Sequence, residues 1–452
     1  MKGYFLPNFP VKAREERFGT IRLAVAKLVP SQCIEISKQL VDAQEKLARE
    51  SIYTIVDWIE QASARWADPN DSIRKEAEAT IPIVSNISVE MLHAALDDLF
   101  KNLRRPVLLK FIEGELSDVR CLDRFCPKKT GIGFTRAFGP RLITHILPGN
   151  ISVISVTSLV CGMLAKSANL LRVSPREALL PVLFAETLRA LWPEMAQSIG
   201  IVTWDKNKTD MTEAAFQNAE VAIVYGNNET ITAVGKMIPP TKRTVFYGHK
   251  LSLGIIARES IRKDLAEKAA IDIACYDQKG CLSPHLFYVE DGGETTAETF
   301  AQWMAQALYA VSRRFPKGKS LAEQAAKIQQ LRGSLPLKGG RVFSSPKGVD
   351  WTVLFDHDPA FDVSPLSRTI WIKPVGDLTE VPSYLEAIRE SIQAIGFALP
   401  EEMQAQLIPK IALMGGCRIC PIGQMQTPPI TWHHDGRFRL LPLLRFVDWE
   451  NP

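Results

Sequence analysis

The segment YDQKGCLSPH, residues 276–285, presents a cysteine where it can act as a nucleophile. Cys281 follows a glycine, and an apolar run at residues 286–289 comes soon after it. This pattern predicts a loop that leads into a buried strand, with the sulfur at the edge of a cleft. A thiol ionises near about pH 8.5 and becomes a good nucleophile when its pKa is lowered. The alternative is a structural thiol that packs as a small apolar group.

The segment ILPGNISVIS, residues 146–155, predicts a strand, a Pro-Gly-Asn turn and then a helix. At the carboxyl end of a parallel strand, such a turn directs backbone N–H groups and a side-chain amide toward a ligand. Asn150 can therefore stabilise an oxyanion that forms during acyl transfer. The alternative is that Asn150 only caps the helix.

Two further strand ends carry residue types that suit a nucleotide. In NLLRVSPREA a predicted strand ends near Arg172 and Ser174, and a cation with a hydroxyl can hold a ribose or its 2′-phosphate. In VYGNNET the turn at Gly226 and Asn227 can receive a phosphate at the start of a helix. The alternatives are a solvated arginine and a turn that only reverses the chain. No G-x-G-x-x-G fingerprint occurs among these strands.

A zinc site is suggested by residue type near the C-terminus, where Cys417 and Cys420 in CRIC are followed by His433 and His434. Adjacent histidines do not easily point at one metal, however, and CRICPIG has the pattern of a buried strand. The DHD triplet at residues 356–358 can bind a cation or lie in a solvated loop. We therefore predict no metal site.

Four segments of the chain must position these residues. Residues 1–125 have helical spacing of apolar positions and predict a helical N-terminal region. Residues 126–250 alternate short β-branched runs with helical stretches, which is typical of a doubly wound parallel sheet and predicts a nucleotide-binding α/β domain. Residues 251–400 predict a second α/β domain, which carries Cys281. Residues 401–452 are expected to form a C-terminal segment that packs back on the body.

Composition narrows the class of protein. The chain has 452 residues, a net charge of +4 and 46% hydrophobic residues, so it can bury ample cores, and its charge does not argue for a nucleic-acid partner. The first residues lack the unbroken apolar stretch of a secretory signal, and no integral membrane segment is predicted. We expect a cytoplasmic protein whose eight cysteines are free thiols.

In this order, the four sites resemble the pattern of the aldehyde dehydrogenase superfamily, which has a Pro-x-Asn turn, a strand ending near a cation, a glycine turn and a Gln-x-x-Cys loop. More closely, the chain resembles the LuxC family of acyl-CoA reductases. The similar stretches are HILPGNISVISVTSLVCGMLAKSANLLRVSP, FYGHKLSLGIIA, ACYDQKGCLSPHLFYVE, SRTIWIKPV, GCRICPIGQM and WHHDGRFRLLPLLRFVDWE. The resemblance implies an aldehyde-dehydrogenase-like fold, in which the missing glycine fingerprint is usual.

The resemblance also implies roles for individual residues. Cys281 falls on the catalytic thiol, and Asn150 falls on the oxyanion-hole amide. Arg172 falls where the superfamily usually has a lysine that holds the adenosine ribose, and Gly226 falls on the glycine of the nucleotide turn, with Asn227 beside it. The change from lysine to arginine keeps the cation but alters its geometry.

One departure from the superfamily concerns the reaction. Where hydrolytic aldehyde dehydrogenases carry a Glu-Leu-Gly-Gly base, this chain reads YGHKLSLG, without a carboxylate. A base that activates water would hydrolyse an acyl-enzyme before hydride arrived, so its absence favours reduction. Candidates for catalytic support are His249, near the vacated position, His285, just past the nucleophile, and Gln278, in the Gln-x-x-Cys loop. Each histidine has the alternative of a core or interface residue.

The activity that the resemblance implies is reduction of a long-chain acyl-CoA to the fatty aldehyde. The Cys281 thiolate would attack the thioester and expel CoA, and NADPH would reduce the acyl-enzyme while Asn150 and the backbone N–H of Cys281 hold the oxyanion. In a close variant, an acyl carrier protein or a partner acyl transferase delivers the acyl group. A non-catalytic scaffold subunit and an enzyme that oxidises aldehydes to free acids are competing hypotheses. The resemblance also implies a homo-oligomer.

Overall fold

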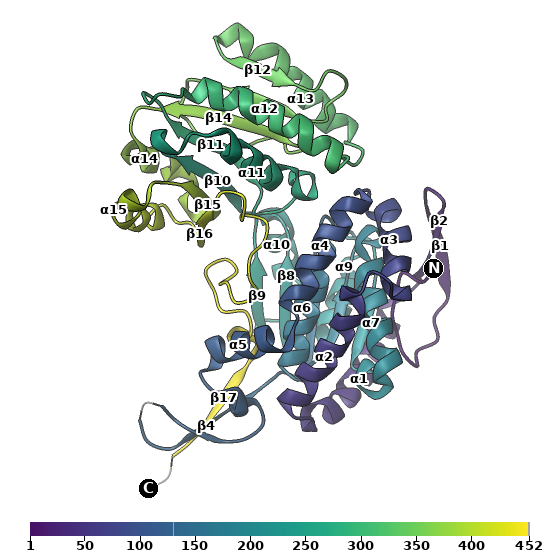
Figure 1. Cartoon of the computed structure of the whole chain (residues 1–452). Coiled ribbons are helices and arrows are strands. Elements are labelled where there is room, and N and C mark those ends of the chain that lie inside the picture. Colours follow the sequence, from purple (N-terminus) through teal and green to yellow (C-terminus); the bar gives the residue numbers. More distant parts are fainter. Residues whose placement is uncertain (130, 451–452) are drawn as a thin grey trace.

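The computed structural model describes residues 1–129 and 131–450 and shows two α/β lobes (Figure 1). The first lobe contains a five-stranded sheet, and the second lobe contains a seven-stranded sheet. A small three-stranded sheet lies apart from both, at the bottom of the figure. The expected α/β fold with parallel sheets and a largely helical N-terminal region is confirmed.

The five-stranded sheet of the first lobe is parallel throughout, in the order β7-β6-β5-β8-β9. Its strands are β5 (Leu142–Ile146), β6 (Ala168–Arg172), β7 (Ile199–Val202), β8 (Val221–Tyr225) and β9 (Arg243–Tyr247). The intervening helices are α6 (Val153–Leu164), α7 (Leu179–Leu191), α8 (Pro193–Ala196), α9 (Thr209–Gln217) and α10 (Asn228–Gly235). The strand order reverses between β5 and β8, so the loops after these strands diverge and leave a crevice at their carboxyl ends.

The N-terminal helices form a layer of the first lobe. They are α1 (Pro30–Arg49), α2 (Ile52–Ala67), α3 (Ser72–Ser85), α4 (Val89–Asn102) and α5 (Arg105–Leu116). Trp66 on α2 is fully buried, stacks on Phe100 of α4 at 5.0 Å and donates its indole N–H to Thr187 on α7 at 3.0 Å. One continuous core therefore joins these helices to α6 and α7.

The expectation that residues 1–125 are helical needs one correction. A hairpin of β1 (Ala13–Phe18) and β2 (Ile21–Ala26) precedes α1, and its tight turn contains Gly19 with φ of 55°.

Among residues 1–129 and 131–450, no single helix is long and apolar enough to cross a membrane, and only the bent pair of α3 and α4 passes that test together.

The seven-stranded sheet of the second lobe has the order β12-β13-β14-β11-β10-β15-β16, with only the edge strand β12 antiparallel to its neighbour. Its strands are β10 (Leu251–Ile256), β11 (Pro284–Glu290), β12 (Arg341–Ser344), β13 (Thr352–Phe355), β14 (Thr369–Val375), β15 (Ile392–Ala398) and β16 (Arg418–Pro421). Its helices are α11 (Lys263–Ala274), α12 (Ala297–Arg314), α13 (Ala322–Ser334), α14 (Val381–Leu385) and α15 (Glu401–Ala412). The expected boundary at residue 400 is wrong, because α15 crosses over to β16 within this sheet.

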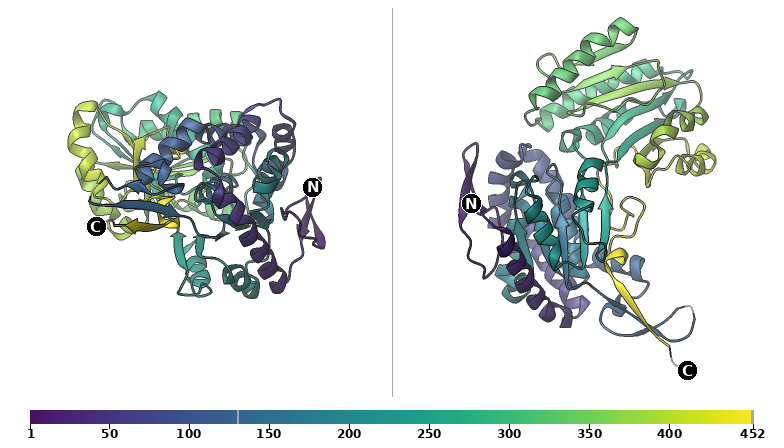
Figure 2. Two further views of the ribbon diagram at one scale, coloured as in Figure 1. Left: turned by 90° about the horizontal axis from the view of Figure 1, so that it is seen from below. Right: turned by 180° about the vertical axis from the view of Figure 1, so that it is seen from behind.

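The three-stranded sheet joins distant parts of the chain. It consists of β3 (Cys126–Pro127), β4 (Phe134–Phe138) and β17 (Arg445–Trp449), all antiparallel, with Phe134 stacked on Trp449 at 5.3 Å. Seen from behind, β17 and β4 extend away from both lobes (Figure 2). The expected start of the nucleotide-binding domain at residue 126 is therefore wrong, because its sheet begins with β5. Residues 422–444 connect β16 to β17 and pass between the lobes.

Candidate active site

Cys281 lies where two cavities meet between the lobes. The larger cavity, of about 590 Å³, is lined by the loop after β5, the ends of β8 and β9, and residues 278–281. The smaller cavity, of about 140 Å³, is mostly apolar and is lined by α4, α6 and residues 426–439. Cys281 lines both cavities. A polar cleft and an apolar cavity that share a thiol can hold two different ligands against the same sulfur.

The loop before Cys281 has an unusual backbone. The short turn Cys275–Gln278 connects α11 to this loop, and residues 276–278 have φ of 52°, 52° and 65°. Residues 366–368, in a facing loop, have φ of 65°, 59° and 60°. Left-handed backbone is costly for residues with side chains and persists where the surroundings enforce it, often at functional sites. Here a buried ion pair ties the two loops, because Arg368 Nε donates to Asp277 Oδ1 at 3.0 Å.

Gln278 also joins the two loops, through its side-chain amide. The Nε2 group donates to the carbonyls of Pro284 and Thr369 at 2.8 Å each, and Oε1 accepts the N–H of Thr369 at 2.9 Å. Gln278 is fully buried, so these bonds are shielded from water. Gln278, a candidate for catalytic support, is therefore held by backbone groups on both sides of its amide. Its amide is occupied by backbone groups, and it positions the loop that carries Cys281.

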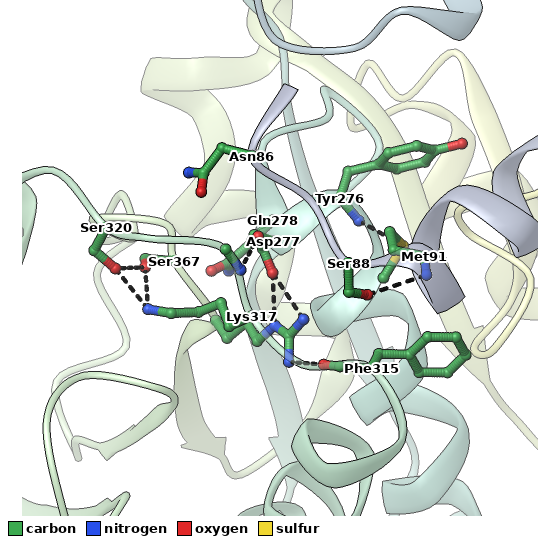
Figure 3. Close-up of polar contacts among 12 residues, drawn as sticks. Asn86, Ser88, Met91, Tyr276, Asp277, Gln278, Phe315, Lys317, Ser320 and Ser367 are labelled. Carbon is green, nitrogen blue, oxygen red and sulfur yellow. Dashed lines mark hydrogen bonds and ion pairs between the residues drawn. The ribbon is translucent and has the colours of Figure 1, made fainter. Parts of the chain in front are cut away.

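Figure 3 shows that a third segment, residues 315–320, holds the same loop. Lys317 Nζ donates to Ser320 and Ser367 at 2.7 Å each, and the backbone N–H of Gly318 donates to Asp277 Oδ2 at 3.0 Å. Burial lowers the pKa of Lys317 to about 8. The turn is thus held from several sides within the second lobe.

Contacts from the first lobe reach the same place. The backbone N–H of Tyr276 points at the sulfur of Met91 on α4 at 3.3 Å (Figure 3). Asn86, at the end of α3, accepts the N–H of Lys319 at 3.0 Å and donates to its carbonyl at 2.9 Å. The helical layer therefore helps to set the position of the Cys281 loop.

The electrostatics around Cys281 keep its thiol protonated at neutral pH. Burial, with a smaller contribution from the carboxylate of Asp435, raises the pKa of the thiol to about 12. The Gln393 amide, whose Nε2 lies 3.9 Å from Sγ, and the backbone N–H groups of Cys281 and Leu282 act in the opposite direction. The thiol therefore needs a proton acceptor before it can attack a carbonyl.

Asn150 lies across the cleft from the second lobe. Its Nδ2 donates to the carbonyl of Lys279 at 2.8 Å, which places the amide next to the Cys281 loop and in the same cleft. The alternative that Asn150 only caps α6 is wrong, because the N-cap residue of α6 is Ser152. An amide nitrogen carries two hydrogens, so the second is available to an oxygen in the cleft.

The four residues predicted for a nucleotide also line the larger cavity. Arg172 donates to the carbonyl of Trp204 at 2.9 Å, and burial lowers its pKa while Asp205 raises it. Ser174 lies 3.3 Å from where a Cβ on Gly149 would sit. Gly226 has no room for a side chain, since a Cβ there would lie 2.7 Å from Thr230. Asn227 caps α10 by accepting the N–H of Thr230 at 2.9 Å, so its side chain shapes the turn.

The smaller cavity was not found from the sequence. Its apolar wall comes from Leu99 and Leu103 on α4, Ile154 on α6, and Ile430 and Trp432 in the C-terminal segment. These residues lie far apart in the chain, and those on α4 and α6 belong to helices that look like ordinary core helices. No local pattern marks them, because the cavity exists only where the three segments face each other.

Family models and known proteins match a large part of the chain. The family model described as "Acyl-CoA reductase (LuxC)" matches residues 47–446. The chain belongs to the LuxC family. It is an acyl reductase, and the predicted resemblance to this family is confirmed.

Relatives and solved structures agree with this assignment. The LuxC-family chain is 23% identical over 407 residues to the long-chain acyl-protein thioester reductase of Vibrio harveyi, and the match covers 89% of this chain and 83% of that protein. It is 24% identical to the protein of the same name from Aliivibrio fischeri, with 88% and 82% covered. Aldehyde dehydrogenase 21 from Physcomitrella patens superimposes with a TM-score of 0.76 at 12% identity, covering 100% of this chain and 98% of that one. The fold is therefore that of aldehyde dehydrogenases.

Two histidines expected to support the thiol of this LuxC-family chain line the larger cavity. His285 is 4% exposed, accepts the backbone N–H of Ser364 on Nδ1 at 3.1 Å, and has a pKa lowered by burial to about 4. Its neutral ring therefore carries its proton on Nε2. His249 lies in the loop after β9, on the other side of the same cavity, close enough for its charge to lower the pKa of His285 further.

The zinc alternative fails for the C-terminal cysteines and histidines. Cys420 is buried on β16, His433 packs edge-on against Phe438, and His434 stacks on Tyr247 at 4.5 Å. Within residues 1–129 and 131–450, the one group of metal-ligating atoms that converges is elsewhere, at Asp118, Cys121 and Cys126. Asp118 in that group already pairs with Arg120 at 2.8 Å.

Asp435 is the residue at this site that the sequence did not reveal. It follows the two histidines in WHHDG and lines the larger cavity together with Cys281. The only sequence feature that points to Asp435 is the Asp-Gly pair, which predicts a tight turn. Such a turn can place the side chain of its first central residue in a cleft.

Proposed function

We propose that this LuxC-family chain reduces a long-chain acyl thioester to the fatty aldehyde with a nicotinamide cofactor, through an acyl-enzyme on Cys281. The observation that carries the proposal is the position of Cys281 at the junction of the two cavities. The apolar cavity suits a hydrocarbon chain, and the polar cleft suits a nucleotide. A thioester carbonyl bound between them would lie against the sulfur.

The chain's own residues supply the acyl transfer. Cys281 would attack the thioester carbonyl and expel the thiolate of the donor. The second amide hydrogen of Asn150 and the backbone N–H of Cys281 would stabilise the oxyanion. A bound nicotinamide cofactor supplies the hydride that reduces the acyl group. The thiohemiacetal oxyanion would then collapse, release the aldehyde and restore the cysteine.

The lining of the polar cleft supports the proposal that the cofactor is a nicotinamide dinucleotide. Gly226 and Gly149 leave space in which a Cβ would crowd Thr230 and Ser174, so backbone groups there can approach a ligand closely. Arg172 and Lys206 line the same part of the cleft, and two cations with the hydroxyl of Ser174 favour a 2′-phosphate. We therefore propose NADPH in preference to NADH.

The acyl donor is the second part of the proposal. An acyl-CoA is the donor that the family description suggests. The relatives named long-chain acyl-protein thioester reductase support the alternative, in which a carrier protein or a partner acyl transferase presents the thioester. Both donors release a thiolate, so the chemistry at Cys281 is the same. A non-catalytic scaffold is disfavoured, because it has no use for a thiol and an amide in one cleft.

The test is turnover of a long-chain acyl-CoA by the purified protein, followed as NADPH loss and aldehyde formation. Cys281→Ala should abolish turnover, with a loss of at least about 10³-fold, because the covalent step has no other nucleophile. Cys33→Ala, on α1 of the first lobe, is the matched control and should retain activity. Turnover in Cys281→Ala would overturn the mechanism. No turnover with acyl-CoA, followed by turnover with an acyl-protein, would establish the second donor.

A further inference from the structure

A tight turn places Asp435 in the cleft beside Cys281. Asp435 and Gly436 have φ of 53° and 71°, and the N–H of Arg437 donates to the carbonyl of His434 at 3.1 Å. Two central residues with positive φ make a type I′ turn, for which Asp-Gly and Asn-Gly are preferred sequences. The turn projects the Asp435 carboxyl into the cavity that Cys281 lines.

The turn is anchored on both sides. The ring of His434 stacks on Tyr247 at 4.5 Å and on Trp432 at 5.0 Å. A few residues later, the carboxylate of Glu115 on α5 accepts the backbone N–H groups of Arg439 and Leu440 at 2.7 and 2.8 Å. The position of Asp435 is therefore fixed by the first lobe, whereas Cys281 belongs to the second.

The Asp435 carboxyl is buried, with a hydrogen bond from the Gln393 side chain but, within residues 1–129 and 131–450, no partner for its Oδ1. Its side chain is 7% exposed, and among the described residues no group hydrogen-bonds its Oδ1. The Nε2 of His434 lies 3.6 Å from this oxygen, beyond hydrogen-bond length. The Gln393 amide lies beside both the carboxyl and the Cys281 sulfur, and Gln393 Oε1 is also unpartnered. A buried oxygen that lacks a donor is costly and calls for an explanation.

The charged and titratable groups around Asp435 come from several elements. Burial raises its pKa, and the Gln393 amide and two cations lower it. The groups that face it are Lys250, Arg437, His434, Tyr247, Cys417 and Cys281. Within the part of the chain that the structure describes, none of these groups, the Cys281 thiol included, donates a hydrogen bond to Oδ1, so this oxygen keeps its acceptor capacity in the cavity that Cys281 lines.

The neighbouring histidines are less suited to take that proton. The Nδ1 of His285 already accepts the N–H of Ser364, so the neutral ring has no free lone pair for the thiol. His434 is held between two aromatic rings, and burial lowers its pKa to about 3. Asp435 lines the same cavity as Cys281 and, unlike these two histidines, keeps a free acceptor oxygen in the described part of the chain.

We infer that Asp435 is the general base that removes the proton from the Cys281 thiol. The inference rests on the proposed function, in which that thiol attacks an acyl thioester. The S–H bond breaks, its electron pair stays on sulfur, and the proton passes to a carboxylate oxygen of Asp435. The sulfur then forms the bond to the acyl carbon, and the donor leaves as a thiolate, which takes a proton from water.

The same proton protects the acyl-enzyme. While Asp435 is protonated it cannot activate water, so the thioester on Cys281 survives until it is reduced. Collapse of the thiohemiacetal releases the aldehyde and a Cys281 thiolate, which recovers its proton from Asp435. One proton from water is consumed in each turnover, by the departing thiolate. This cycle differs from the hydrolytic one, in which a permanently ionised glutamate serves the water.

The test compares wild type with Asp435→Asn, which keeps the preferred Asn-Gly turn. The first readout is alkylation of Cys281 by iodoacetamide as a function of pH, which needs no substrate. The second is release of CoA from a long-chain acyl-CoA in a single turnover without cofactor. Wild type should react at a rate that is level around neutral pH. Asp435→Asn should react about 10²-fold or more slowly at neutral pH, with a rate that rises about tenfold per pH unit.

The controls separate this inference from the proposed function. Asp435→Glu should recover part of the level profile, and Asp448→Asn, on β17, should match wild type. In one outcome, the alkylation rate is independent of pH in wild type but not in Asp435→Asn, and wild type releases no CoA from the acyl-CoA. That result would support Asp435 as the base and reject acyl-CoA as the donor. Normal turnover with identical pH profiles in wild type and Asp435→Asn would overturn the base and leave the reductase intact.

Discussion

At the scale of single residues, Cys281 has two requirements that oppose each other. The apolar cavity that suits a hydrocarbon chain also removes water from the thiol, and this burial raises the pKa of Cys281 to about 12. Attack on a thioester requires the thiolate. Polar groups therefore have to reach the sulfur from elsewhere, and the structure brings the Gln393 amide and the Asp435 carboxyl to it.

A prediction at this scale concerns Arg172 and the cofactor. Replacing Arg172 with Gln removes a cation from the cleft and should reduce the preference for NADPH over NADH by about tenfold or more, because a charged hydrogen bond to phosphate contributes about 1.5–3 kcal/mol. The measurement is the ratio of kcat/KM for the two cofactors. Arg141→Gln, at the opposite end of β5, is the control and should leave the ratio unchanged. An unchanged ratio in Arg172→Gln would remove this residue from cofactor selection.

At the scale of elements, α4 has two functions that sequence periodicity does not separate. One face packs in the core of the first lobe, through residues such as Leu96 and Phe100. The adjacent positions Ala95, Leu99 and Leu103 line the apolar cavity that ends at Cys281. The start of α4 also contacts the Cys281 loop through Met91. One wall of the apolar cavity and the position of the Cys281 loop therefore depend on the same helix.

A prediction at this scale is that Leu99→Phe shortens the preferred acyl chain. The larger ring would occupy part of a cavity of about 140 Å³, so kcat/KM should fall at least about tenfold more for the longest acyl chains than for short ones. Overpacking costs about 1–3 kcal/mol of stability, but the ratio between chain lengths is insensitive to the folded fraction. Val89→Phe, at the exposed start of α4, is the control. Equal losses for all chain lengths would show that the cavity does not hold the chain.

At the scale of the whole molecule, the site depends on how the lobes and the helical layer meet. Glu177 illustrates this, because its buried carboxyl lies near Ser85 of α3, Ser152 at the start of α6 and Lys279 of the Cys281 loop. Burial raises the pKa of Glu177 to about 7. A carboxyl in an unfolded chain titrates near about 4.3. The folded protein therefore binds this proton more tightly than the unfolded chain does.

The sign of the resulting pH dependence follows from linkage. The stabilisation from protonated Glu177 is complete below about pH 4 and is lost as pH rises through about 7, so this residue makes the free energy of unfolding fall across that range. Glu177→Gln should remove the contribution of this residue, so the free energy of unfolding should depend less steeply on pH than in wild type. Urea unfolding at several pH values measures this, with the exposed Glu194→Gln as control. A profile in Glu177→Gln as steep as in wild type would contradict the assignment.

Sequence patterns predicted the parts of the site that are local. Asn150, Arg172, Gly226 and Cys281 each follow or precede a strand, and a strand with its adjoining turn is encoded by contiguous residues. Parallel strands end at the same edge of a sheet, so Asn150, Arg172 and Gly226 gather at one edge of the first sheet, whereas Cys281 precedes β11 of the other sheet and meets them across the cleft. The order of the four sites resembles the aldehyde dehydrogenase pattern, and longer stretches over most of the chain predicted the LuxC family, which the match over residues 47–446 confirms.

Errors and omissions arose where distant segments meet. Gln278 is the glutamine of the Gln-x-x-Cys pattern that ends at Cys281. Its side-chain amide nevertheless hydrogen-bonds backbone groups, including those of Thr369 on the distant strand β14. The boundary expected at residue 126 does not match the sheets because β4 pairs with β17 from the far end of the chain, and the one at residue 400 falls between β15 and β16, which pair through the crossover helix α15. Pairing between distant strands leaves no mark in either strand alone.

The sequence by itself determined the fold class, the family and the strand-end residues, because hydrophobic periodicity and turn chemistry act over a few neighbouring positions. Only the tertiary structure decided that α4 walls an apolar cavity and that Asp435 lies beside Cys281. Asp435 and Cys281 are far apart in the chain, and each belongs to a different anchored segment. Their meeting depends on the packing of whole elements against each other, which contiguous residues do not encode.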